Sequence, residues 1–155
     1  MDRLLSILPP HEGLLPKWLV LLSATSMGNS IQAYTTLKYT TQVYPGWRSS
    51  KEGHKPSSSN ADPESSPVTP LSSRTFGTWT FLAAVVRIYA AHNITNRLFY
   101  DLAIWTYVIA VWHFFSEWLI FGSTRWGRGL AGPVIVSSMS LIWMLWSRDA
   151  YVERC

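Results

Sequence analysis

The feature that most constrains this 155-residue chain is a set of four apolar stretches, each close to 20 residues long. They lie at about residues 18–37, 75–94, 99–121 and 130–146. A helix rises 1.5 Å per residue, so about 20 residues cross the hydrocarbon core of a bilayer. We therefore predict an all-α membrane protein, a bundle of four transmembrane helices in one domain. In the last stretch, Gly132-Pro133 fits a helix start better than a helix interior.

The alternative is a soluble four-helix protein with very apolar helices. The third stretch argues against it, because residues 102–111 are apolar on every side, whereas a helix of a soluble bundle keeps a polar face. Charged residues make up 14% of the chain, below the roughly 25% of a typical soluble domain. Tryptophans such as Trp18, Trp126 and Trp146 lie near the ends of the stretches, as in an interfacial aromatic belt. The composition favours the lipid bilayer as the environment of these helices.

A polar block rich in proline and serine, residues 48–73, separates the first two apolar stretches. It has too few apolar residues to offset the entropy of ordering, so we predict a disordered loop. A phosphorylated or partner-binding loop at Ser66-Pro67 and Thr69-Pro70 is the functional alternative. Lysine and arginine residues are scattered along the chain, and no run is dense enough to predict nucleic-acid binding.

Polar side chains inside the apolar stretches are the candidates for function, because a charge at the bilayer centre costs about 2.5 to 3.5 kcal/mol even on the insertion scale. In the first stretch, polar residues recur at helical spacing and share one face; they are Thr25, Asn29, Gln32 and Thr36. We expect this face to point into the bundle or toward a partner protein.

The second stretch carries Arg87, which needs a polar partner at that depth. If the second and third stretches form a hairpin, Arg87 lies level with Thr106, and Asp101 is about 7.5 Å away along the axis. We predict that Asp101 pairs with Arg87, with help from Asn29 or Gln32.

A second predicted ion pair joins Arg74 to Glu117 near one membrane interface. Glu117 also shares a helix face with His113, at the spacing nearest to a metal or acid–base motif in this chain. A catalytic metal needs about three protein ligands, and the other histidines are far apart in the sequence. We interpret His113 and Glu117 as a structural, hydrogen-bonded pair and expect no catalytic, cofactor-binding or metal site.

Five blocks of sequence carry a resemblance to a known family: LPKWL at 15–19, NSIQ at 29–32, RTFGTWTF at 74–81, HFFSEWLIF at 113–121 and GPVIVSSMSLIWM at 132–144. Their order resembles the ergosterol biosynthetic protein 28 family over the whole chain except residues 48–73. The resemblance implies a multi-pass protein of the endoplasmic reticulum membrane. It also implies a role in tethering the sterol C-4 methyl oxidase, the decarboxylating C-3 sterol dehydrogenase and the 3-keto-sterol reductase, and association with the sterol C-24 methyltransferase.

Three functional hypotheses follow from the residues and the resemblance. The leading one is a non-catalytic scaffold for sterol C-4 demethylation in ergosterol biosynthesis. The second is a membrane-embedded lipid-modifying enzyme that uses His113, Glu117 and Asp101. The third is a small lipid carrier or transporter, suggested by Arg87 within the membrane.

Overall fold

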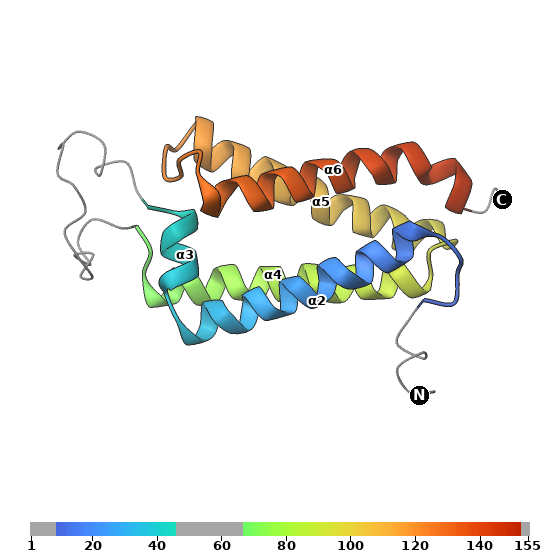
Figure 1. Cartoon of the computed structure of the whole chain (residues 1–155), viewed down its shortest axis with the longest axis horizontal. Helices are drawn as coiled ribbons and strands as arrows, with labels where there is room; N and C mark the ends of the chain where they lie inside the picture. The colour runs from blue at the N-terminus through green and yellow to red at the C-terminus, as the bar shows by residue number, and fades with distance from the viewer. Residues whose placement is uncertain (1–8, 46–66, 153–155) are drawn as a thin grey trace.

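The fold, seen in a computed structural model that describes residues 9–45 and 67–152, is helical, with no strand in that part of the chain. Four long helices and one short helix follow in the order α2 (Leu14–Thr35), α3 (Lys38–Val43), α4 (Pro70–His92), α5 (Arg97–Leu119) and α6 (Arg128–Tyr151). Figure 1 shows α2 lying against α4 in one layer and α5 against α6 in the other, with α3 across one end. The predicted all-helical class is confirmed, whereas α3 was not predicted.

Two helical segments, Arg97–Leu119 and Gly129–Tyr151, are long and apolar enough to cross a membrane. Only 28% of the residues in the apolar window of each segment are buried inside the molecule. Helices α2 and α4 are not among these two segments, and each contains more Ser and Thr side chains than α5. The sequence and structure together therefore support a membrane protein with two candidate spans.

Helix α4 begins at Pro70, five residues before the predicted span and inside the predicted loop. Thr69 caps it: its hydroxyl accepts from the Ser72 amide at 3.1 Å, and the Ser72 hydroxyl accepts from the Thr69 amide at 2.8 Å. This reciprocal capping box, followed by proline at the first helical position, fixes the start of the helix. Thr69-Pro70 is thus a helix cap, and residues 70–73 of the predicted loop are helical. Its residues 48–66 lie outside the described part of the chain.

The prediction that Gly132-Pro133 begins the last helix is wrong, because α6 begins at Arg128 and Pro133 is inside it. Proline removes one backbone hydrogen-bond donor and so disfavours a helix that continues on its N-terminal side. Here the turn of α6 that precedes Pro133 packs closely on α3. A Cβ placed on Gly129 would lie 2.3 Å from the Gln42 carbonyl oxygen, so only glycine permits this approach. The contact with α3 stabilises a helical turn that the sequence pattern around the proline does not predict.

The interface between α2 and α4 is built from small residues and hydroxyl groups. The Ser30 hydroxyl donates to the Gly77 carbonyl at 2.7 Å, and the Ser73 hydroxyl donates to the Ala33 carbonyl at 2.8 Å. A Cβ on Gly77 would lie 2.9 Å from the Tyr34 ring, so the two helices are in close contact there. Close approach with hydroxyl-to-backbone hydrogen bonds is typical of helix packing in lipid.

Candidate functional site

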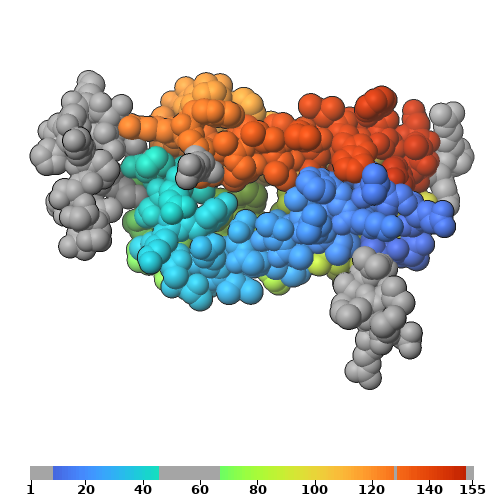
Figure 2. Space-filling view, viewed as in Figure 1, coloured from blue at the N-terminus to red at the C-terminus, as the bar shows by residue number. Residues whose placement is uncertain are grey.

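A cavity of about 290 Å³ lies between the four long helices and is the candidate functional site. Figure 2 shows a hollow between α2 and α6, with more deeply placed atoms of the intervening helices at its floor. Most of the wall is apolar, with side chains such as Leu22, Ala83 and Phe114. Polar groups interrupt the wall at Thr25, Ser26, Asn29, Thr80, Arg87, Tyr107 and Ser137.

Among the described residues that line this cavity, Arg87 of α4 is the only charged one, and it is 7% exposed. Its Nε donates to the Thr106 hydroxyl at 3.0 Å, and Nη1 makes a longer contact of 3.4 Å with the Ser26 hydroxyl. The guanidinium carbon lies 4.1 Å from the centre of the Tyr107 ring, which adds a cation–π interaction. The expectation that Arg87 lies level with Thr106 is confirmed.

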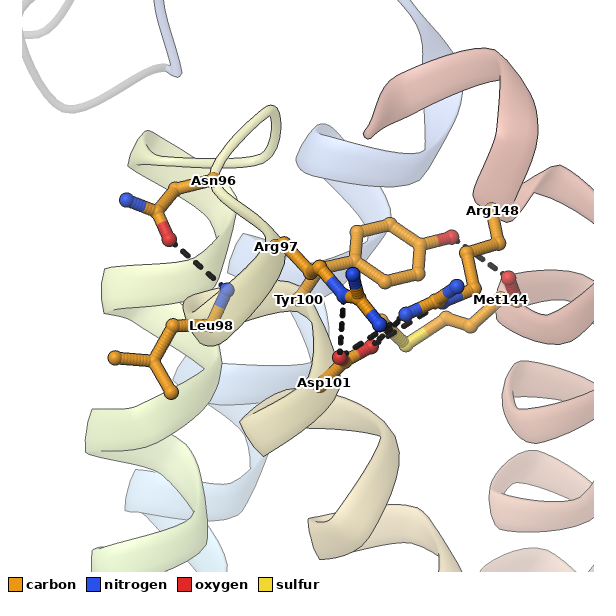
Figure 3. A network of polar contacts seen from close by, with 7 residues as sticks. All are labelled: Asn96, Arg97, Leu98, Tyr100, Asp101, Met144 and Arg148. Atoms are coloured by element: carbon orange, nitrogen blue, oxygen red, sulfur yellow. Dashed lines mark hydrogen bonds and ion pairs between the residues drawn. The ribbon is translucent and has the colours of Figure 1, made fainter. Parts of the chain in front are cut away.

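The predicted ion pair between Arg87 and Asp101 is wrong. Asp101 is bound instead by Arg148, whose Nη2 lies 2.8 Å from Oδ1 and 3.0 Å from Oδ2 (Figure 3). Arg97 of the same helix lies 3.7 Å from Oδ2 and is largely exposed. Asp101 is in the first turns of α5, and the antiparallel packing of α5 and α6 brings the last turns of α6 beside it. The end of α6 therefore supplies a partner that is closer than the deeper Arg87.

The polar face predicted on the first span is only partly directed into the bundle. Asn29 is half-buried and lines the cavity, and Thr25 lies at its edge, while Gln32 and Thr36 are exposed. The buried side of α2 is formed by a different stripe: Leu15, Pro16, Leu19, Leu22, Ser23, Ser30 and Ala33. Gln32 and Thr36 thus lie on the outer surface of the bundle.

The predicted pair of Arg74 and Glu117 is not formed among the described residues. Arg74 is exposed beside the chain that joins α2 to α3, near Thr36 and Leu37. The Glu117 carboxylate accepts a hydrogen bond from the Ser123 hydroxyl. Glu117 therefore stabilises the turn that follows α5, and the predicted hydrogen bond between Glu117 and His113 is not formed among the described residues.

His113 joins a second group of polar residues at the α3 end of the bundle. Its Nε2 lies 2.6 Å from the Tyr44 hydroxyl, and its ring packs edge-on against Trp79 with centroids 5.6 Å apart. Burial, with a smaller contribution from the Glu117 carboxylate, raises the pKa of Tyr44, so the phenol keeps its proton to a higher pH than an exposed tyrosine does. His113 and Glu117 face a larger, more open cavity of about 610 Å³. Within residues 9–45 and 67–152, no three His, Cys, Asp or Glu side chains are grouped to hold a metal.

Several residues of the central cavity were missed by the sequence analysis, above all Tyr107 and Ser26. Tyr107 lies in the stretch interpreted as uniformly apolar. Its hydroxyl is the one feature of the sequence that could have indicated a polar position there. It is 1% exposed, and its hydroxyl makes no hydrogen bond with a described residue; Ser140 is nearby, without hydrogen-bonding geometry. The sequence also did not predict Arg148 as the partner of Asp101.

The sequence is similar to known proteins over almost its whole length. The family described as "Erg28 like protein" matches residues 15–142. Ergosterol biosynthetic protein 28 of Candida albicans is 43% identical over 149 residues, which cover 96% of each chain. The Saccharomyces cerevisiae protein of the same name is 40% identical over 90% of this chain and 84% of its own. The human protein named "Ergosterol biosynthetic protein 28 homolog" is 33% identical over 94% of this chain and 87% of its own. No solved structure matches the chain.

Proposed function

Because the chain belongs to the Erg28-like family, we propose that it is a non-catalytic scaffold of the endoplasmic reticulum membrane that holds enzymes of ergosterol biosynthesis together. The observation that carries this proposal is the near full-length similarity to proteins named for ergosterol biosynthesis. The enzymes we expect it to tether are the sterol C-4 methyl oxidase, the decarboxylating C-3 sterol dehydrogenase and the 3-keto-sterol reductase, together with the sterol C-24 methyltransferase.

The exposed apolar surface supports a bundle in which all four long helices cross the membrane. Large apolar side chains face outward on each of them, among them Ile31 on α2, Leu82 on α4, Trp112 on α5 and Trp146 on α6. A soluble monomer rarely exposes apolar patches of this extent, whereas lipid solvates them. In α2 and α4, the hydroxyl groups that lower hydropathy are largely hydrogen-bonded to backbone carbonyls.

A tethering role has a simple physical basis. Membrane enzymes that act in sequence exchange a poorly soluble intermediate, and linking them raises the effective concentration of each active site for its neighbour's product. Gln32 on α2 and Thr36, the residue that follows α2, are the proposed contacts for a partner helix, since a polar group that faces lipid alone is unfavourable. His113 and Glu117 hold Tyr44 and Ser123, which supports a structural role for both.

The test is photo-crosslinking in native membranes from a cell that makes ergosterol. A photoreactive amino acid at Gln32 should capture the sterol C-4 demethylation enzymes, whereas the same probe at the outward-facing Trp112 of α5 should capture them much less. Deleting the chain should also reduce co-purification of the methyl oxidase with the dehydrogenase. Unchanged co-purification of these two enzymes without the chain would refute the tethering role. Turnover of a sterol substrate by the purified chain alone would refute a non-catalytic role.

A further inference from the structure

The unusual feature of the central cavity is a buried cation whose hydrogen-bonding capacity is only partly used. A guanidinium carries five N–H groups, and Arg87 directs one to Thr106 and one, at longer distance, to Ser26. The ion pairs within residues 9–45 and 67–152 involve Arg97 and Arg148, both with Asp101. The remaining donors of Arg87 therefore lie at a cavity wall without a carboxylate partner from the described chain.

The wall around Arg87 offers further polar groups. The Tyr107 hydroxyl is buried and without a hydrogen bond among the described residues, and Asn29 and Ser137 also line the cavity. A buried polar group without a partner costs free energy, so this arrangement is better satisfied by a ligand that brings acceptor atoms. The planar, charged guanidinium group is best matched by an oxyanion that accepts two parallel hydrogen bonds.

The apolar part of the ligand is indicated by the rest of the wall and by the opening. The lining is mainly aliphatic and aromatic, and the hollow between α2 and α6 faces the side of the bundle, where the proposed orientation places lipid (Figure 2). A volume of about 290 Å³ lies at the lower limit of roughly 300 to 1,000 Å³ for ligand pockets. The head group and the first part of an apolar body fit inside, and the remainder would extend between α2 and α6 into the bilayer.

We propose that this cavity binds a membrane-dissolved amphiphile through its anionic oxygen head group, with the charge held by Arg87 and the apolar body lying between α2 and α6. Carboxylate and phosphate monoester head groups share the required chemistry. This binding activity is separate from tethering and depends on the proposed function only for the membrane orientation of the helices.

The test uses the purified full-length chain in neutral phosphatidylcholine nanodiscs and a photoreactive fatty acid with its diazirine near the carboxylate. Labelling should map to the residues that line the cavity. Unlabelled oleic acid and lysophosphatidic acid are compared as competitors, and the stronger competitor identifies the preferred head group. Methyl oleate should compete poorly because it lacks the charge. Arg87→Gln should lower affinity for the acid about tenfold or more, since hydrogen bonds to a charged group are lost.

A matched pair of variants separates cavity binding from general lipid contact. Thr25 and Ala24 are adjacent exposed residues of α2, but only Thr25 lines the cavity. Thr25→Trp should obstruct the opening and reduce specific labelling, while Ala24→Trp should leave it unchanged, even if Arg87→Gln proves too unstable to purify. Equal competition by oleic acid and methyl oleate, together with equal labelling of the two tryptophan variants, would overturn the proposal. The enzyme crosslinks at Gln32 are measured separately, so either proposal can fail without the other.

Discussion

The contact between α3 and α6 gives the sharpest prediction about stability. A methyl group added by Gly129→Ala would lie 2.3 Å from the Gln42 carbonyl oxygen and 3.0 Å from the Val43 amide nitrogen. Ordinary van der Waals contact begins near 3.4 Å, so α3 or the first turn of α6 must shift by about 1 Å. Both obstructing atoms belong to the backbone, so no side-chain rotation can relieve the overlap.

The magnitude follows from two opposing terms. Overpacking of this kind costs about 1–3 kcal/mol, whereas replacing glycine by alanine within a helix gains about 0.5–1 kcal/mol. We therefore expect Gly129→Ala to lower the free energy of unfolding by about 0–2.5 kcal/mol, and to leave it about 1–3 kcal/mol below that of a helical Gly→Ala change without the overlap. Gly28→Ala provides the control, because Gly28 is also helical and a Cβ there would meet no atom within 4 Å. It should stabilise the protein by about 0.5–1 kcal/mol.

The assay is unfolding of both variants by sodium dodecyl sulfate in mixed micelles, followed by far-ultraviolet circular dichroism. The difference between the variants isolates the steric term, since both replace a helical glycine by alanine. Equal free energies of unfolding for Gly129→Ala and Gly28→Ala would show that α3 does not pack on α6 as described.

Three further predictions concern the polar contacts. Asp101→Asn and Arg148→Gln should each lower the melting temperature, and the double variant should be no less stable than either alone, whereas Arg97→Gln should have little effect in the same thermal scan because it is largely exposed. Ser73→Val should destabilise the bundle by about 0.5–1.5 kcal/mol in the micelle assay, through loss of a buried hydrogen bond between α2 and α4. Because the pKa of Tyr44 is raised on folding, the free energy of unfolding should fall as pH rises above about 10. Unfolding measured at a series of alkaline pH values should show a smaller fall for Tyr44→Phe. An identical alkaline profile in the variant would contradict this prediction.

The assumption that the second and third apolar stretches form a hairpin correctly placed Arg87 level with Thr106. It succeeded because the rise per residue of a helix is fixed, so residues at equal distances from the connecting turn lie at the same depth. The same assumption gave the wrong partner for Asp101, since it considered only the second and third stretches. The partner, Arg148, lies 47 residues after Asp101, in α6. Depth alone does not identify which neighbouring helix is closest.

The sequence by itself determined the helical class, the approximate positions of the four long helices and the family, because the length of an apolar run and its flanking residues are local properties. Only the tertiary structure decided which face of α2 is buried, that Asp101 binds Arg148, and that Arg87 and Tyr107 border a common cavity. These features depend on the azimuthal rotation of each helix and on its neighbours. Both are set by close packing of small residues such as Gly77 and Gly129, whose contacts join segments far apart in the chain.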